Sequence, residues 1–138
     1  DKPDNAKIKL YALDRMVKIR VTDDRFTPPE ELDPAGYLAG AFGVAVYDDI
    51  RPCTIRVRVA CDGVKYLRTL PLHASQQEVE THDEYAIFEF YVAPTPEFYQ
   101  AMLNCHGNFE VLSPGNVREE TRRIIDGLHV LYCSPTND

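Results

Sequence analysis

The sequence predicts an α+β domain, and three observations support this prediction. Residues 85–93, Tyr-Ala-Ile-Phe-Glu-Phe-Tyr-Val-Ala, lack Gly and Pro and are largely apolar on both faces, which is typical of an interior strand. Apolar alternation on either side of this segment predicts further strands. Three segments with helical periodicity and capping residues separate them, and three such helices are hard to place in a β-sandwich.

The elements beyond Pro52 alternate along the chain. The predicted order is a strand from residue 54, a helix capped by Asp62 and ended by Pro71, strands at 77–81 and 85–93, a helix from 95, a short strand at 109–112 and a last helix from 116. Right-handed crossovers arrange this order as a split β-α-β, ferredoxin-like sheet with the first and third strands in the middle. The strand at 77–81 is polar and suits a sheet edge. The predicted core stripe of the last helix is Val117, Thr121, Ile124, Leu128 and Leu131.

The first part of the chain predicts a separate organisation. Charged and apolar residues alternate over 7–12 and 16–21 around a turn at Leu13 and Asp14, which is the pattern of a β-hairpin. A short helix is expected from Pro34, and the residues from 43 to 52 have the composition of a linker. We therefore predict one domain at 1–52 and a second at 53–138.

Composition excludes some classes of function. No apolar run approaches the roughly 18 residues that span a bilayer, so no membrane partner is expected. The net charge of -7 argues against nonspecific nucleic-acid binding by the whole chain, although it leaves room for a local basic patch. Four widely spaced cysteines favour the reduced thiols of a cytoplasmic protein over a disulfide framework. The chain begins with Asp rather than Met, so we expect it to be part of a longer protein.

Motifs for catalysis and metal binding are weak. The histidines, at positions 73, 82, 106 and 129, lack a close second ligand apart from the neighbouring Cys105 and His106, whereas zinc sites normally have paired ligands. Acidic residues lie at expected turns, caps or solvated faces, and no phosphate-binding loop or nucleophile elbow is present. We expect no metal, no cofactor and no enzymatic activity.

One face of the predicted hairpin is basic. Its residues are Lys7, Lys9, Tyr11, Lys18 and Arg20, and Arg15 lies at its turn. Like charges opposed across a strand pair are unfavourable unless an anion or a carboxylate lies near, and an aromatic ring among them offers a surface on which a base could stack. Two interpretations stay open, an anion-binding face and a solvated ribbon neutralised by Asp23 and Asp24.

The opposite face of the predicted hairpin is apolar. It carries Ile8, Leu10, Val17 and Ile19. A two-stranded ribbon is marginally stable alone and leaves its edges open, so we expect the chain to associate with itself through this ribbon.

Several motifs resemble those of a known family. Tyr-Ala-Leu-Asp-Arg-Met at 11–16, Val-Thr-Asp-Asp-Arg-Phe at 21–26 and the segment 37–44 are similar to the closing hairpin and exit helix of WYL-domain bacterial transcriptional regulators. The segments 66–79, 85–93 and 107–114 resemble WCX, the C-terminal extension of these regulators. The Trp-Tyr-Leu strand that names the WYL domain is absent, and Ala12 stands where many relatives carry Arg.

The resemblance implies the C-terminal, effector-sensing and oligomerising region of a transcriptional regulator. Residues 1–52 would then be the end of an Sm/SH3-like WYL barrel, and residues 53–138 a WCX domain that forms a dimer. The implied effector is a nucleotide or a single-stranded nucleic acid, held by Lys7, Lys9, Tyr11, Arg15, Lys18 and Arg20. Operator DNA would be bound only through an upstream winged helix-turn-helix. A protein-interaction module and, with less support, a small ferredoxin-like enzyme stay open as alternatives.

Overall fold

The computed structural model describes residues 11–27, 29–30, 33–43, 46–47, 49–104 and 108–133. The chain divides into two compact units, residues 1–33 and residues 34–138. The helices of the second unit are α1 (Pro34–Leu38), α2 (Cys61–Thr69), α3 (Pro96–Leu103) and α4 (Gly115–Cys133). The predicted domain boundary between residues 52 and 53 stays a prediction.

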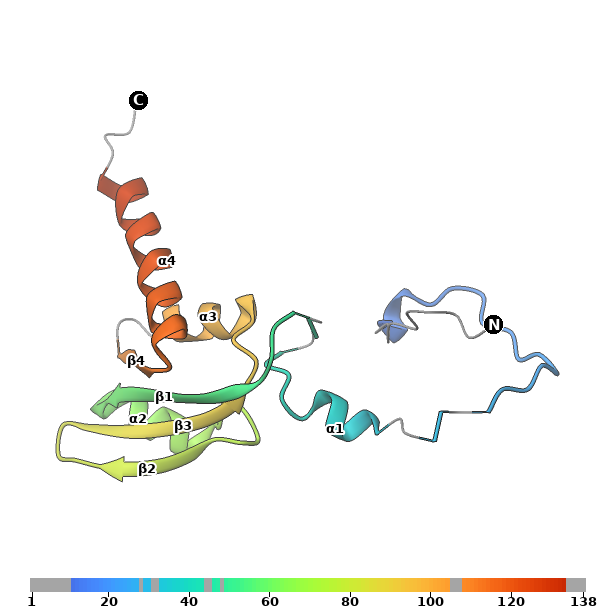
Figure 1. Ribbon diagram of the computed structural model, residues 1–138, viewed down its shortest axis with the longest axis horizontal. Coiled ribbons are helices and arrows are strands. Elements are labelled where there is room, and N and C mark those ends of the chain that lie inside the picture. Colours follow the sequence, from blue (N-terminus) through green and yellow to red (C-terminus); the bar gives the residue numbers. More distant parts are fainter. Residues whose placement is uncertain are drawn as a thin grey trace. The chain divides into compact units, whose positions relative to one another are not determined.

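The second unit is built on a four-stranded antiparallel sheet (Figure 1). The strands are β1 (Cys53–Ala60), β2 (Gln77–Thr81), β3 (Tyr85–Val92) and β4 (Phe109–Ser113). Their order across the sheet is β2-β3-β1-β4, and each neighbouring pair is antiparallel. The predicted α+β class is therefore confirmed. The first and third strands lie in the middle of the sheet, as predicted, and the polar strand β2 forms an edge.

One face of this sheet carries the hydrophobic core. Ile55, Val57 and Val59 alternate along β1 and are fully buried. The register places them opposite Phe90, Phe88 and Ala86 of β3, which are also buried. The intervening residues of β1, among them Arg56 and Arg58, belong to the other face because successive side chains of a strand alternate. This second face is therefore charged and open.

Helices α2 and α3 cover the core face. Val64 and Leu67 of α2 and Phe98 and Met102 of α3 belong to the same buried cluster as the strand residues. Gly63 lets α2 approach closely, because a Cβ atom there would lie 2.6 Å from Cγ1 of Val59. The helix begins at Cys61, so Asp62, predicted as its cap, lies in the first turn instead. A carboxylate in that turn still favours the helix through the helix dipole.

The segment before β1 is attached to this core. Phe42 is 7% exposed, and its ring meets the ring of Phe98 edge-on with 5.5 Å between centroids. The amide of Ala93 donates a hydrogen bond of 2.8 Å to the carbonyl of Gly40. Phe42 lies directly before the predicted linker at 43–52, and this buried aromatic anchors the chain on α3.

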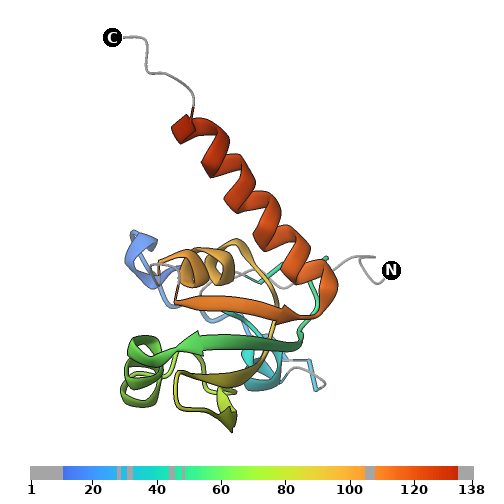
Figure 2. The ribbon, with the colours of Figure 1, turned by 90° about the vertical axis from the view of Figure 1, so that its left-hand side faces the viewer.

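Helix α4 begins on the sheet and continues past it. Val117 is buried and Ile124 is partly buried, as predicted for the core stripe. Leu128 and Leu131 are 43% and 72% exposed, so the prediction of a core role for these two residues is wrong. Figures 1 and 2 both show the C-terminal turns of α4 projecting away from the sheet. The core ends before the helix does, and this leaves the second half of the stripe uncovered.

The first unit contains a short 3-10 helix, η1 (Leu13–Arg15), at the position of the predicted turn. The structure describes no strand between residues 11 and 27, so the predicted strand at 16–21 is corrected. Lys18, with a φ of 59°, interrupts an extended backbone at this point. Every residue from 11 to 27 is exposed, and a ribbon without cover is only marginally stable. Residues 7–10 of the predicted hairpin lie outside the described residues.

Candidate functional site

The predicted effector-binding residues lie in the first unit. Tyr11, Arg15, Lys18 and Arg20 are all exposed, whereas Lys7 and Lys9 lie outside the described residues. The structure does not bring the four described residues onto one strand face, because no strand forms there. Among the residues that the structure describes, none is a hydrogen-bond or ion-pair partner for these four side chains. Their charges are therefore open to solvent or to a ligand.

The open face of the sheet is a second candidate, because it also carries arginines. Arg56 donates a hydrogen bond of 2.5 Å to Glu80, and its Nε lies 3.3 Å from Glu89. Arg58 lies 3.6 Å from the carboxylate of Glu110. An anion would have to displace these carboxylates before it could bind either guanidinium. The charges of this face thus hold neighbouring strands together and are poorly suited to phosphate.

The aromatic residue nearest these arginines is likewise occupied. The guanidinium of Arg58 lies 4.4 Å from the ring centroid of Tyr85, at cation–π distance. The imidazole of His82 stacks on the same ring with 4.3 Å between centroids. Tyr85 therefore already has two ring partners within the protein, which leaves little surface for a nucleic-acid base.

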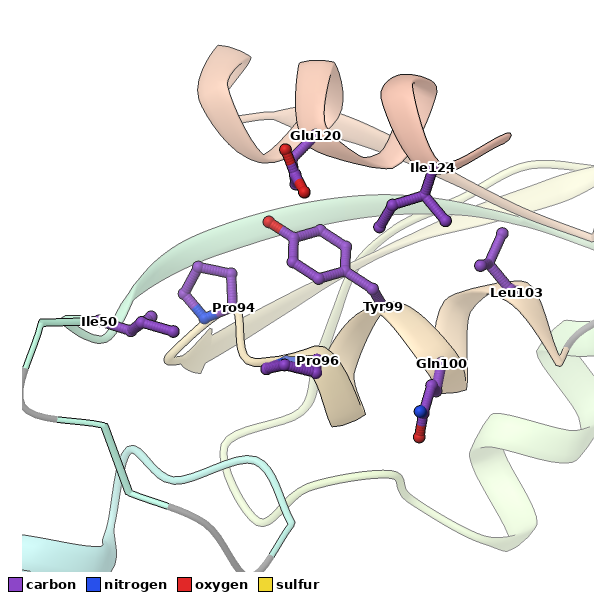
Figure 3. A pocket seen from close by; sticks show the side chains of 8 residues that line it. All are labelled: Ile50, Pro94, Pro96, Tyr99, Gln100, Leu103, Glu120 and Ile124. Carbon is purple, nitrogen blue, oxygen red and sulfur yellow. The ribbon is translucent and has the colours of Figure 1, made fainter. Parts of the chain in front are cut away.

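A third candidate is a pocket of about 550 Å³ between α3 and α4, which we call the α3–α4 groove (Figure 3). It is lined by Ile50, Pro94, Pro96, Tyr99, Gln100, Leu103, Glu120 and Ile124. Three segments that are far apart in the sequence supply these residues. Figure 3 shows the phenol of Tyr99 pointing toward the carboxylate of Glu120, while Leu103 and Ile124 face each other across the groove. Mostly apolar walls with a few polar groups are typical of small-molecule sites of this size.

The polar groups of the groove set its preference for charge. Burial raises the pKa of Tyr99, and the negative charge of Glu120 raises it further. Arg123 donates hydrogen bonds of 2.9 and 2.6 Å to Glu120, and these bonds lower the pKa of that carboxyl. At neutral pH the groove therefore presents a neutral phenol beside a carboxylate. It suits an apolar ligand with a hydrogen-bond donor and disfavours a phosphate group.

Helix α4 carries one pair of potential metal ligands that was not predicted from the sequence. His129 and Cys133 are four residues apart on α4, and Nε2 lies 3.5 Å from Sγ. The spacing of four residues along a predicted helix was the signal that would have revealed this pair. The described residues contain no group of three potential ligands, so these two side chains do not complete a site by themselves. Cys105 and His106, the other neighbouring pair, lie outside the described residues.

The remaining histidines have structural partners. His73 hydrogen-bonds to the hydroxyl of Ser75 at 2.8 Å and stacks on Phe42, and His82 stacks on Tyr85. Three cysteines that the structure describes, Cys53, Cys61 and Cys133, are free thiols. Among the described helices, none has the length and apolar character needed to cross a bilayer.

Comparison with known proteins identifies the second unit. The family profile of the WCX domain matches residues 51–128, which is more than half of the chain. The match includes all four strands, α2, α3 and most of α4, and therefore the groove between the last two helices. No curated protein matches the sequence. The chain belongs to the WCX domain family.

Proposed function

We propose that this chain is the effector-sensing and oligomerising C-terminal region of a cytoplasmic, bacterial transcriptional regulator, with the DNA-binding domain outside it. Membership of the WCX family carries the proposal, because WCX domains are C-terminal extensions of WYL-type regulators. The strand order β2-β3-β1-β4, with α2 and α3 on one face, supports a ferredoxin-like assignment of the second unit. The residues before it would then be the end of a WYL barrel.

The distribution of paired and unpaired cations supports an effector site in the first unit. Six arginines of the second unit each form an ion pair with a carboxylate: Arg56, Arg58, Arg68, Arg118, Arg122 and Arg123. Arg15, Lys18 and Arg20 have no such partner among the described residues. These cations without a described partner lie close to Tyr11 in the sequence, within a chain of net charge -7, and they favour a ligand that supplies phosphates and a base.

The effector we propose is a nucleotide or a short single-stranded nucleic acid, and Lys7 and Lys9 belong to the same proposed site. Binding of each phosphate would release counterions, so affinity should fall as the salt concentration rises. A protein-interaction module is the second candidate function, and the exposed apolar half of α4 favours it. An enzyme has less support, because the polar residues of the groove show no nucleophile with an adjacent base.

The test uses the full-length regulator and a fluorescently labelled single-stranded DNA oligonucleotide. We expect the double variant Lys9→Glu, Lys18→Glu to bind the oligonucleotide more weakly. Its plot of log affinity against log salt concentration should be less steep, by about 0.7 for each phosphate group that the variant no longer neutralises. Fluorescence anisotropy over a salt series measures both quantities.

The matched control is the double variant Arg51→Glu, Lys65→Glu, which makes the same change of charge at two exposed positions of the second unit. It should keep the salt dependence of the unmodified protein. Equal losses of affinity in the two double variants would mean that only net charge matters. Unchanged binding by the Lys9 and Lys18 variant would leave these residues as a solvated ribbon.

A further inference from the structure

The C-terminal half of α4 has an apolar stripe that the described residues of the second unit leave largely exposed. We define the α4 stripe as Ile125, Leu128, Leu131 and Tyr132, which are 48%, 43%, 72% and 89% exposed. At 100° per residue these side chains continue the face on which Val117 is buried and Ile124 lines the groove. The stripe extends roughly 12 Å beyond Ile124, since an α-helix rises 1.5 Å per residue.

Such a helix end is unfavourable in a lone molecule. Helical turns gain most of their stability from packing an amphipathic face, and on these turns Ile125 and Leu128 are only about half covered, while Leu131 and Tyr132 are mostly exposed. An exposed Tyr and three exposed aliphatic side chains in one row also keep a continuous apolar surface in water. Burial of the α4 stripe against another apolar surface would therefore be favourable.

The α3–α4 groove beside the stripe also has an exposed apolar surface. Ile50, Pro94 and Leu103 form apolar walls that stand open between α3 and α4 (Figure 3). Ile124 belongs to the groove and is one helical turn from Leu128, so groove and stripe form one continuous surface. A projecting apolar ridge and an adjoining apolar hollow on one molecule allow two copies to cover each other about a twofold axis.

Charge also favours a second copy as the partner. Helix α4 carries three arginines and three acidic residues, so its net charge is zero within a chain of net charge -7. Arg122 bonds Glu119 and Asp126, and Arg123 bonds Glu120, within the helix itself. Two acidic copies repel each other wherever charged surfaces meet, and this neutral helix provides a surface where that repulsion is small. A basic partner would gain nothing from docking here.

We propose that the α4 stripe and the α3–α4 groove of one copy bind their counterparts on a second copy of this chain, and so form a symmetric dimer. The inference rests on the oligomerising part of the proposed function and names its surface. This surface takes the place of the hairpin ribbon that was predicted to mediate self-association, because residues 16–21 of that ribbon form no strand. A Tyr side chain alone buries roughly 150–250 Å², so stripe and groove together give an interface of about 1,000 Å² in total. That is the lower range of specific interfaces, and the dimer should dissociate at low concentration.

The experiment is sedimentation equilibrium of the 138-residue chain from micromolar to millimolar concentration. Leu131→Asp places a carboxylate in the α4 stripe, and Val130→Asp is the matched control. Val130 is 63% exposed and lies one residue away, on the opposite side of the helix from Leu128. Both substitutions are at exposed positions, so circular dichroism should show the same helix content in both variants.

We expect the unmodified chain to dimerise and Leu131→Asp to weaken the dimer by about tenfold or more, because a charge would be buried without a partner. Val130→Asp should change the dissociation constant by less than about twofold. A chain that stays monomeric at millimolar concentration would overturn the proposal, as would equal effects of the two variants. The measurement contains no nucleic acid, so its failure would leave oligonucleotide binding by the full-length regulator untouched, and failure of that binding would leave the dimer untouched.

Discussion

Two segments of this protein have nearly the same pattern and different structures. Residues 16–21 are Met-Val-Lys-Ile-Arg-Val, and residues 54–59 are Thr-Ile-Arg-Val-Arg-Val. The second segment is the middle of β1, whereas the first is exposed chain without strand pairing. Alternation of apolar and basic residues is therefore compatible with a β-strand but is not sufficient to form one.

The two segments differ in the neighbouring strands and side chains that pack against them. Strand β1 pairs with β3 on one side and β4 on the other, and its apolar residues Ile55, Val57 and Val59 are 0% exposed. Its arginines meet carboxylates on the neighbouring strands β3 and β4, and Arg56 also meets Glu80 on β2. In the first segment, Val17 and Ile19 are 81% and 76% exposed. Strand preference reflects packing against neighbouring strands. Among the described residues of its unit, this segment has no neighbouring strand.

The largest expected effect of this difference is in hydrogen exchange. Amides of β3 should exchange only on global unfolding, which typically requires about 5–15 kcal/mol in a domain of this kind. Amides of residues 17–27 should exchange at rates close to those of an unfolded chain, since they lie outside any described helix or strand. Mass spectrometry of deuterium uptake measures both. Slow exchange at 17–21 in a monomer would contradict the expected difference, because it would require strand pairing that the described residues do not show.

The next effect is on stability, through two phenylalanines. Phe90→Ala should lower the free energy of unfolding by about 3–5 kcal/mol, because Phe90 is fully buried in the core. Phe26→Ala is the matched substitution in the first unit, where the side chain is 84% exposed, and should change it by less than about 0.5 kcal/mol. Urea denaturation followed by far-ultraviolet circular dichroism gives both values. A large cost for Phe26→Ala would show that the first unit has a core of its own.

Substitutions at two helix glycines should have opposite effects in a packed and in an open region. Gly63→Ala should cost about 1–3 kcal/mol, since its Cβ would lie 2.6 Å from Val59 and 2.9 Å from Phe109. Gly127→Ala should instead stabilise by about 0.5–1 kcal/mol, because no described atom beyond its chain neighbours and the surrounding helix backbone lies within 4 Å of the added Cβ, and Ala is the better helix former. Thermal unfolding of the two variants should shift in opposite directions. A shared direction would mean that α2 yields easily or that α4 is not a helix at residue 127.

The smallest effect concerns an ion pair of the second unit. Arg68 donates hydrogen bonds of 2.8 and 2.5 Å to Glu78, and these bonds, with one from Thr81, lower the pKa of Glu78 to about 2. Glu78→Gln should destabilise the protein by about 1 kcal/mol at pH 7, a modest value because the arginine is half exposed.

The pH dependence of that loss follows from the depressed pKa. The unfolded carboxyl takes up its proton near pH 4.5, whereas the folded one stays ionised until about pH 2. The stabilisation is therefore complete above pH 4.5 and disappears as the pH falls to 2. Urea titrations of the protein and of Glu78→Gln should converge over that interval. Glu84→Gln, at an exposed turn, is the control and should change the free energy of unfolding by less than about 0.5 kcal/mol at either pH. A constant difference between protein and Glu78→Gln at all pH values would contradict the role of the charge.

Much of the second unit could be predicted from the sequence. The polar edge strand falls at 77–81 in both prediction and structure, and the strand predicted at 85–93 is β3. These predictions were correct because composition on the two faces of a strand records whether it is covered on both sides. The start of α3 was marked by Pro96 at its first position. The sequence shows which basic and aromatic residues the first unit contains, but it does not show how they are arranged in space.

Tertiary structure alone decided the rest. The α3–α4 groove takes its walls from residues near 50, 94–103 and 120–124, and no local pattern could indicate that these segments meet. The sequence shows that the arginines of β1 share one strand face. Only the structure shows that carboxylates on β2, β3 and β4 pair with them. The stripe of α4 has one periodicity along its whole length, yet Val117 is buried and Leu131 is exposed. Periodicity is a property of the segment itself, whereas burial and charge neutralisation depend on residues elsewhere in the chain that fold against it.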